Sequence, residues 1–339
     1  MSFEIHIAPV KGSLLYVLMR EAKCDDVLYT SNDGKRDIGA IYMARVDRAI
    51  KGTGGMFVDI GPEKAFLRSK QNYPQGRYLP VQIQQCASND KPIRVSDQID
   101  YRGEFVVLTP GRPGVHQSRK IKSVELLDEA QAQLSSLLPE DCGMILRSAS
   151  KNVGFDEIAE DTEALLSQLS RVEEANETAG LISAAPVGQR RALIEWSDTG
   201  VYEHEHFPEY ILEALHNALA LPLTCAGGEV YIEATRAMLT VDVNTGANTA
   251  PTAARDVNLS LASRLPRWLR MMGWGGQLCI DLAPMPVGAR KPFESAMGKG
   301  AKQSGLGFNG YGFGPLGLYE ASIKYDRRPL PRNILEQLG

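Results

Sequence analysis

Between residues 37 and 100 the chain alternates short β-rich stretches with turns rich in glycine and proline, and this pattern limits the folds open to it. β-Branched and aromatic residues favour strands, whereas glycine and proline supply the turns between them. Several short strands joined in this way favour a small barrel. We therefore predict a barrel with strands over Ile38–Ile50, Met56–Ile60, Tyr78–Gln84 and Pro92–Ser96.

The composition is that of an ordinary globular protein. Of 339 residues, 43% are hydrophobic and 23% are charged, and the length suits two or three small domains. No run approaches the roughly 20 apolar residues of a membrane helix, and the N-terminus lacks the features of a secretory signal. The five cysteines are isolated, which argues against a zinc cage or a disulfide framework. We expect a cytoplasmic protein that binds neither zinc nor a membrane.

Positive charge gathers near the C-terminal end. Between residues 286 and 332 there are eight basic and three acidic residues, although the formal net charge of the chain is −4. The net charge argues mildly against RNA binding, but local distribution matters more. Five of these bases are candidate phosphate contacts, with plain solvation as the alternative for each: Lys299, Lys302, Lys324, Arg327 and Arg328.

Hydrophobic periodicity and turn residues predict further elements. The expected strands and helices are Glu4–Pro9, Ser13–Glu21, Phe105–Thr109, Gly143–Arg147, Ser123–Leu138, Phe155–Glu174 and Phe207–Ala220. Composition predicts a loop over Thr178–Gln189 and a mobile loop over Gly305–Gly310. Pro266 is expected to kink or end the helix predicted over Thr252–Met272.

Two aspartates each stand at the end of an apolar β-type segment. Asp242 follows Leu239–Val241, and Asp281 follows Leu278–Ile280. A carboxylate buried there is costly unless it is paired or binds a metal ion, and two such residues side by side would suit Mg²⁺. Asn244, two residues after Asp242, would point to the same face of the strand. The alternative is that both aspartates cap turns at strand ends.

Three segments resemble the catalytic region of the ribonuclease E/G family, which has a D-[IV]-N-[ST] strand, a helix beginning near N-L-E-A-A and a G-G-hydrophobic-I-D strand. They are Thr240–Gly246, Asn258-Leu259 and Gly275–Asp281. The resemblance implies that Asp242 and Asp281 bind Mg²⁺, with Mn²⁺ as an alternative ion. It also implies that Asn244 orients the scissile phosphate or the attacking water. The implied reaction is hydrolysis of single-stranded RNA to a 5′-phosphate and a 3′-hydroxyl.

The resemblance extends over most of the chain and implies a composite α/β (α+β) fold. An RNase H-like subdomain would be interrupted by an S1/OB-type barrel and a sensor-like region, and a DNase I-like catalytic domain would follow. The implied segments are 1–36 and 186–226 for the RNase H-like subdomain, 37–100 for the barrel, 101–185 for the sensor-like region and 227–339 for the catalytic domain. In the barrel, Phe57 and Phe66 would stack on RNA bases; alternatively, both rings fill its core.

The sequence also departs from the family pattern. Arg147 and Ser148 stand where the family has the R-T-A-G sequence of its 5′-monophosphate sensor, but Ser150 replaces the glycine. The C-P-x-C zinc link is absent, so the family's zinc-linked dimer is not expected and the oligomeric state stays open. These features leave two functions: a Mg²⁺-dependent endoribonuclease in RNA processing or decay, or a catalytically weak RNA-binding regulator or chaperone that keeps the fold.

Overall fold

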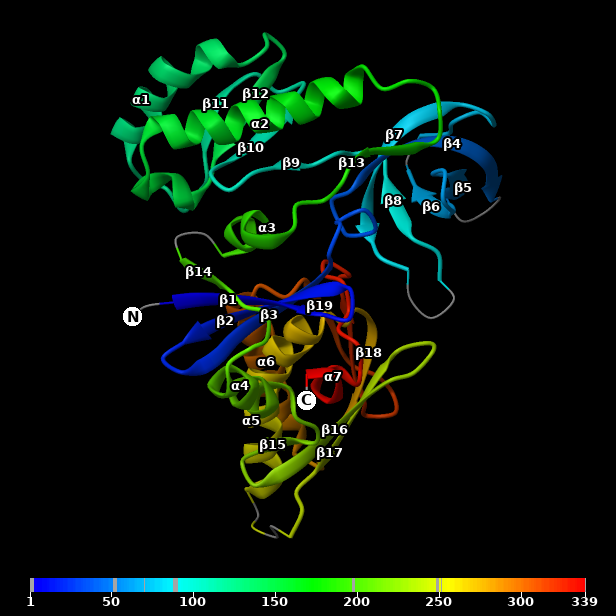
Figure 1. The fold of residues 1–339 in the computed structure, drawn as a ribbon. Helices are drawn as coiled ribbons and strands as arrows, with labels where there is room; N and C mark the ends of the chain where they lie inside the picture. Colours follow the sequence, from blue (N-terminus) through cyan, green and yellow to red (C-terminus); the bar gives the residue numbers. More distant parts are fainter. Residues whose placement is uncertain are drawn as a thin grey trace. The chain divides into compact units, whose positions relative to one another are not determined.

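The computed structural model describes residues 3–50, 54–69, 71–87, 91–196, 199–247, 250 and 252–338. By compactness the chain divides into two units, one formed by Met1–Tyr29 with Glu203–Gly339 and the other by Thr30–Tyr202 (Figure 1). Both units mix helices and sheets, as expected for an α/β protein. Within the described residues, no helix is long and apolar enough to cross a membrane. The four boundaries between the five predicted segments stay predictions, because compactness divides the chain more coarsely.

Five strands of the second unit close into the predicted barrel. Their order is β4-β5-β6-β8-β7, and β7 pairs back with β4. The strands are β4 (Ile41–Ile50), β5 (Gly55–Asp59), β6 (Lys64–Arg68), β7 (Tyr78–Gln85) and β8 (Arg94–Ser96). The loop predicted over Thr178–Gln189 is wrong, because it contains β13 (Gly180–Ser183) and the start of α3 (Gly188–Glu195). Strand β13 is too short to be evident by itself and forms by pairing with β4.

The same unit contains a second sheet, β11-β12-β10-β9, packed with two helices. Its strands are β9 (Tyr101–Arg102), β10 (Val106–Pro110), β11 (Gly114–Gln117) and β12 (Cys142–Leu146). The two helices are the α-helices α1 (Val124–Leu134) and α2 (Phe155–Glu173), and the segment also has two short 3-10 helices, η1 (Ser135–Leu137) and η2 (Ser148–Asn152). The hydroxyl of Ser123 caps α1 by accepting from the Leu126 amide. Helix α2 buries its apolar face, including Leu165, and its acids face outward except Asp161, which accepts from the amides of Phe105 and Val106.

The first unit contains a mixed sheet of six strands and an N-terminal antiparallel sheet. The N-terminal strands are β1 (Phe3–Val10), β2 (Ser13–Arg20) and β3 (Lys23–Ser31), and β14 (Gly200–Glu203) pairs in the same sheet. The six-stranded sheet has the order β15 (Leu223–Cys225), β16 (Gly228–Ala234), β17 (Leu239–Asn244), β18 (Gly276–Asp281), β20 (Tyr319–Ile323) and β19 (Phe308–Phe313). The mobile loop predicted over Gly305–Gly310 is wrong, because β19 begins within it. The RNase H-like and DNase I-like descriptions stay predictions.

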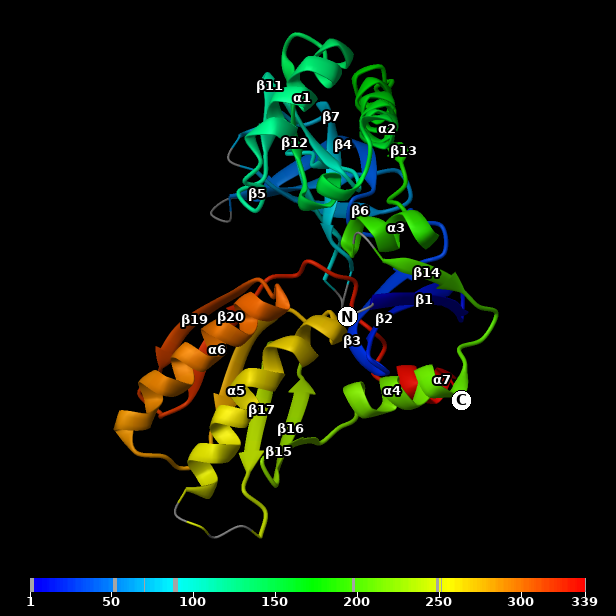
Figure 2. The same ribbon diagram turned by 90° about the vertical axis from the view of Figure 1, so that its left-hand side faces the viewer.

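Helices cover one face of the six-stranded sheet, as Figure 2 shows for α5 and α6. The helices of this unit are α4 (Glu209–Leu219), α5 (Ala253–Met272), η3 (Val287–Ala289), α6 (Arg290–Ser304) and α7 (Ile334–Leu338). The inward side chains of the strands, α5 and α6 form one apolar core with Trp268 among its largest members. Helix α6 was not predicted from the sequence, because Gly298, Gly300 and Pro292 obscure its helical pattern.

Helix α5 continues through Pro266, so of the two effects predicted for this proline, a kink or an end of the helix, the end is wrong and the kink stays a prediction. Proline lacks the amide that would donate to the carbonyl of Ala262, which costs about 3 kcal/mol in an isolated helix. The buried face of α5 offsets this cost, since each buried aliphatic side chain contributes roughly 1.5–3 kcal/mol. Helix α6 approaches at this turn through Gly300, where an added Cβ would lie 2.8 Å from the Ala262 oxygen.

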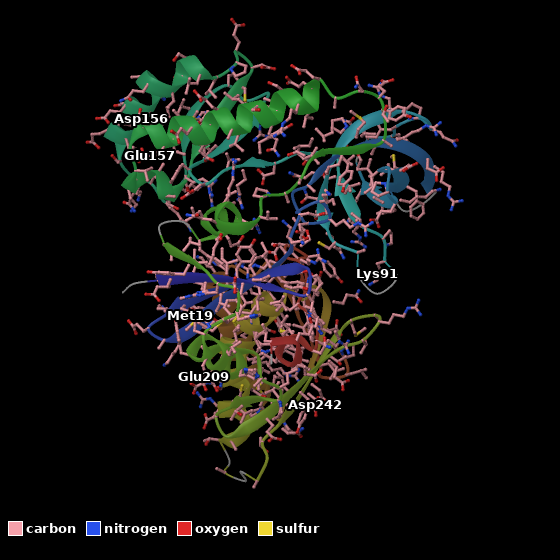
Figure 3. The ribbon with its side chains drawn as sticks, viewed as in Figure 1. Met19, Lys91, Asp156, Glu157, Glu209 and Asp242 are labelled. Atoms are coloured by element: carbon pink, nitrogen blue, oxygen red, sulfur yellow. The ribbon has the colours of Figure 1, made fainter. Side chains whose placement is uncertain are left out.

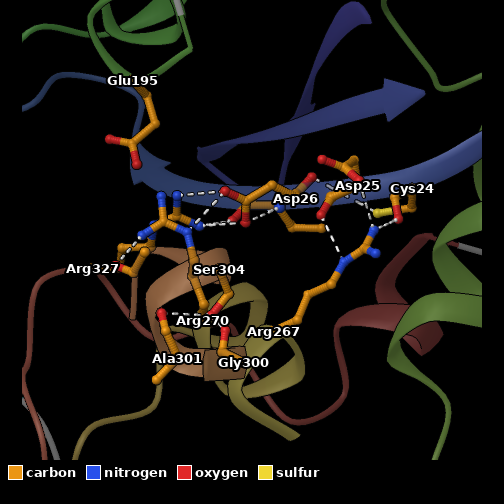
Figure 4. A network of polar contacts seen from close by, with 12 residues as sticks. Cys24, Asp25, Asp26, Glu195, Arg267, Arg270, Gly300, Ala301, Ser304 and Arg327 are labelled. Carbon is orange, nitrogen blue, oxygen red and sulfur yellow. Dashed lines mark hydrogen bonds and ion pairs between the residues drawn. The ribbon is translucent and has the colours of Figure 1, made fainter. Parts of the chain in front are cut away.

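A buried ion-pair network joins β3 to the C-terminal part of the first unit (Figure 4). The guanidinium of Arg327 donates from Nη1 to Asp26 Oδ1 at 2.7 Å and from Nη2 to Asp26 Oδ2 at 2.8 Å. Arg270 of α5 donates from Nε to the same carboxylate at 3.1 Å. Arg327 is only 4% exposed. The prediction that Arg327 contacts RNA is therefore wrong, because its charge is held inside the fold by Asp26.

We predict that Arg327→Met lowers the free energy of unfolding by about 3–5 kcal/mol, because it leaves the Asp26 carboxylate buried with fewer partners. Thermal unfolding followed by circular dichroism measures the loss. The control is Lys324→Ala, which removes an exposed cation from the same region and should change stability by less than about 0.5 kcal/mol. Equal melting temperatures for the two variants would contradict a structural role for Arg327.

Candidate functional site

Asp242 and Asp281 are neighbours across two parallel strands. Strands β17 and β18 pair in parallel through the crossover helix α5, and their register aligns Asp242 with Asp281. Adjacent strands lie about 4.8 Å apart, so the two carboxylates are side by side. Asp242 is labelled in Figure 3 on β17. The structure thus brings together two residues that are 39 positions apart in the sequence, counted from 242 to 281.

Both carboxylates are exposed, which corrects the expectation that they are buried. The strands alternate: Val241, Val243 and Ile280 point into the core, and the two aspartates point to the opposite, open face. Because the side chains stay in contact with solvent, neither charge carries the burial cost that we had inferred from the apolar segments. The pair is therefore accessible to an ion and to a large substrate.

Asn244 lies on the same face as Asp242, as predicted from the strand period. Its Nδ2 donates to Asp242 Oδ2 at 2.9 Å. This contact orients one carboxylate oxygen and leaves the other available. The three oxygen-bearing side chains of Asp242, Asn244 and Asp281 thus share one corner of the open face.

These residues fit a hard divalent cation. Carboxylate oxygens suit Mg²⁺, which binds one or two carboxylates and completes its shell with water and substrate phosphate. Among the residues that the structure describes, no group of three or more His, Cys, Asp or Glu residues could hold a metal ion. A cation held by Asp242 and Asp281 would therefore have two carboxylate ligands from the protein.

Cys279 lies on the same face of β18, two residues before Asp281, and is half-buried. Burial raises the pKa of its thiol above the ordinary value, and the nearby charges of Glu320 and Asp281 raise the pKa further. The raised pKa favours the protonated thiol over the thiolate. Its shifted pKa also shows that the acids around Asp281 create a negative field.

Asn258 is a positioning residue that sequence reasoning placed in the motif without a role. It lies on α5, is fully buried, and both donates a hydrogen bond to the backbone of Ala283 and accepts one from it. Its Nδ2 donates to the Ala283 carbonyl at 2.8 Å, and its Oδ1 accepts from the Ala283 amide at 3.2 Å. Because Ala283 is two residues after Asp281, this pair of hydrogen bonds fixes the end of β18 that carries the carboxylate.

We predict that Asn258→Ala lowers the free energy of unfolding by about 1–3 kcal/mol, because it leaves both Ala283 backbone groups buried without their partner. It should also lower the affinity for Mg²⁺ more than Asn217→Ala, a matched change at an exposed position of α4. Thermal unfolding and isothermal titration with Mg²⁺ measure the two effects. A stable variant with parental Mg²⁺ affinity would show that Asn258 does not position Asp281.

Phe57 and Phe66 lie on the outer face of the barrel. Along β5 and β6, residues that point into the barrel core alternate with the two phenylalanines. The core residues of these strands are Met56, Val58, Ala65 and Leu67. The two rings are cross-strand neighbours with centroids 6.0 Å apart in an edge-to-face arrangement. The alternative that both rings fill the core is thus wrong. The ring of Phe66 rests against Gly55, where an added Cβ would meet its Cζ at 2.2 Å.

Arginines flank the two rings in the same cross-strand row. The register runs Arg48↔Phe57↔Phe66↔Arg94 over β4, β5, β6 and β8. The guanidinium carbon of Arg48 is 5.8 Å from the centroid of the Phe57 ring. Aromatic rings between cations form the kind of surface on which single-stranded nucleic acids stack. Sequence analysis missed both arginines, because only the strand register places them beside the rings.

The other four residues predicted to contact RNA phosphates do not lie together at one site. Lys299 and Lys302 are exposed on α6, on the helical side of the sheet, and do not flank Asp242. Lys324 is exposed after β20, and Arg328 is half-buried with its guanidinium carbon 5.6 Å from the Tyr29 ring centroid. The structure brings none of these four beside the carboxylate pair.

The predicted sensor residues differ in their surroundings. The guanidinium of Arg147 donates to the carbonyls of Gly103 and Glu104, and its Nη2 donates to the carbonyl of Ile194 at 2.9 Å. Burial lowers the pKa of Arg147 from its ordinary value, and the charge of Arg102 lowers it further. Ser148 is exposed at the start of η2. Arg147 therefore has a structural role, and 5′-phosphate sensing stays a prediction.

Comparison with known proteins identifies a family for this chain. Residues 101–201 and 182–324 match the Ribonuclease E/G family. Ribonuclease E of Synechocystis sp. (strain ATCC 27184 / PCC 6803 / Kazusa) is 24% identical over 318 residues, which cover 74% of this chain and 47% of that protein. Ribonuclease G of Escherichia coli (strain K12) is 25% identical over 375 residues, which cover 89% of this chain and 76% of that protein.

The chain belongs to the Ribonuclease E/G family, as the sequence motifs predicted. Ribonuclease E of Nostoc sp. (strain PCC 7120 / SAG 25.82 / UTEX 2576) is similar to the same extent, with 26% identity over 318 residues that cover 46% of that protein. The chain thus spans about half the length of the cyanobacterial ribonuclease E proteins and about three quarters of ribonuclease G.

Proposed function

We propose that this protein is a metal-dependent endoribonuclease that cleaves single-stranded RNA in RNA processing or decay. The observation that carries the proposal is the parallel register of β17 and β18, which aligns the exposed Asp242 and Asp281 on an open face. Membership of the Ribonuclease E/G family and the aromatic outer face of the barrel support an RNA substrate. An open face, unlike a closed pocket, accepts a polymer.

In this proposal Asp242 and Asp281 hold the Mg²⁺ ion, and Mn²⁺ is the alternative. When bound, such an ion supplies Lewis-acid stabilisation of the phosphoryl oxygens and lowers the pKa of bound water. The Asn244 amide, oriented by Asp242, positions the scissile phosphate or the attacking water. The proposed products are a 5′-phosphate and a 3′-hydroxyl, which require attack of water on the side opposite the 3′ oxygen.

The RNA chain is proposed to be held in part by the barrel, where Phe57 and Phe66 stack on bases. Lys299, Lys302, Lys324 and Arg328 stay proposed phosphate contacts at the periphery. A contact of a 5′-monophosphate with Arg147 and Ser148 would require the guanidinium to share its bonds to main-chain carbonyls. Sensing of a 5′-monophosphate by Arg147 and Ser148 stays a proposal on these terms.

We predict that Asp242→Asn and Asp281→Asn each lower the rate of Mg²⁺-dependent cleavage by at least about 100-fold, because each removes one of the anionic ligands of the ion. RNA binding should persist, since neutral side chains repel phosphate less than carboxylates do. Cleavage of an end-labelled, AU-rich single-stranded RNA, together with a filter-binding assay of the same RNA, measures both. Chelation should abolish cleavage by the parent protein.

Glu233→Gln is the matched control for these variants. Glu233 is an exposed carboxylate on the open side of β16, but it is not aligned with the aspartate pair. Its neutralisation should leave cleavage within about threefold of the parent rate, less than one tenth of the effect expected at a metal ligand. A parent protein that binds RNA but never cuts it with Mg²⁺ or Mn²⁺ would favour the RNA-binding regulator instead.

We predict that Phe57→Ala and Phe66→Ala raise the dissociation constant for single-stranded RNA, each by the roughly 1–3 kcal/mol of a base–aromatic stack. Phe57→Tyr keeps the ring and should bind like the parent. Fluorescence anisotropy of a labelled oligonucleotide measures the affinities. Unchanged affinity in the double alanine variant, with the barrel still folded, would mean that RNA does not stack on this face.

A further inference from the structure

The open face of the six-stranded sheet bears an aromatic ring directly beside the carboxylate pair. Tyr231 of β16 is the cross-strand partner of Asp242, which is in turn aligned with Asp281. The three residues form a row over three neighbouring strands. Cross-strand partners in an antiparallel pair lie about 5 Å apart, so the ring is next to the side chain of Asp242.

The ring of Tyr231 is held in place but is not covered. Its hydroxyl donates to Glu229 Oε2 at 2.9 Å, and Glu229 is the cross-strand partner of Asn244. The ring therefore extends along β16, past Asp242 and towards Asn244. Tyr231 is nonetheless 45% exposed. An anchored ring with an exposed surface loses little conformational entropy when a flat ligand stacks on it.

The acidic residues around Tyr231 explain why an aromatic ring would help this face to bind RNA. The exposed acidic side chains on this face of the described strands are Glu229, Glu233, Asp242, Asp281 and Glu320. A negatively charged face repels the phosphates of RNA, even though Mg²⁺ would offset part of the repulsion. Base stacking is attractive whatever the charge, because every nucleobase has a π-face.

We propose that Tyr231 is a nucleobase-stacking platform that binds the base next to the phosphate held at Asp242 and Asp281. The inference rests on the proposed function, which it deepens by naming a base-binding subsite at the point of cleavage. The occupant is a base of the single-stranded RNA itself. Because a tyrosine ring stacks on any base, the platform fixes the position of the cleaved bond and selects for unpaired RNA, whose bases are free to stack.

A structural role is the competing explanation, since tyrosine fits the half-buried surface of a sheet. The two explanations predict different results for Tyr231→Phe and Tyr231→Leu. A platform needs only the ring, so phenylalanine should preserve it and leucine should remove it. The Tyr231–Glu229 hydrogen bond is lost in both variants, so an effect of that bond alone would appear equally in both.

The experiment measures base stacking without cleavage. An Asp281→Asn protein is mixed in Mg²⁺ with single-stranded oligoribonucleotides of one sequence, each carrying 2-aminopurine at a different position. Stacking on an aromatic ring quenches this fluorescent base. We expect quenching at one position that Tyr231→Phe retains and Tyr231→Leu loses, with a roughly 5- to 150-fold rise in Kd for the leucine variant.

Tyr210→Leu is the matched control, because Tyr210 is a tyrosine with similar exposure, 51%, on α4 and away from the open face. It should change neither the quenching nor the affinity. With Asp281 restored, Tyr231→Leu should raise KM for cleavage more than it lowers kcat. Circular dichroism melting confirms that each variant is folded.

Parental quenching and affinity in Tyr231→Leu would overturn the platform. Equal losses in Tyr231→Phe and Tyr231→Leu would also overturn it and assign the effect to the hydroxyl. These outcomes are separate from the fate of the proposed function, because stacking is measured in a protein that is not expected to cut. Absence of cleavage by the parent protein would contradict the nuclease proposal and leave the quenching result interpretable.

Discussion

The parallel pairing of β17 with β18 is the interaction on which the site depends. In a parallel pair the same ends of both strands meet, so residues at the carboxyl ends of two distant segments become neighbours. The pairing needs a crossover long enough to return the chain, and α5 supplies it. The register matters equally: a shift of one residue would turn Asp281 into the core and bring Ile280 to the open face.

The central part of this site could be predicted because its signals are local. Asp242, Asn244 and Asp281 each stand at the end of an apolar strand pattern, and their alignment follows once the strands are known to pair in parallel. The barrel was equally visible, since short strands and turns alternate within it. The local pattern could not predict that the side chains of Asp242 and Asp281 are exposed to solvent. An apolar segment suggests burial on both faces, whereas one face of this sheet is open.

The features that could not be predicted from the sequence depend on contacts between residues far apart in the chain. Arg327 has the sequence setting of a surface cation, yet its partner Asp26 is 301 residues away and only the fold brings them together. The same holds for the row of Arg48 and Arg94 around the barrel rings, which exists only through the strand register. Positive charge in a sequence therefore identifies candidates, and the structure decides which of them stabilise the fold and which face a ligand.

The arrangement of charge explains how a protein with a negative net charge could act on a polyanion. Basic residues lie beside the rings of the barrel, whereas the described strands around Asp242 present mainly acids. In the proposed function, the barrel binds RNA through stacking and cation contacts, and the carboxylates act on the phosphate. A divalent ion bound at the carboxylates is attracted by the same negative field that repels bare RNA. The acids then favour the metal-bound state, and phosphate binding at this face becomes conditional on the ion.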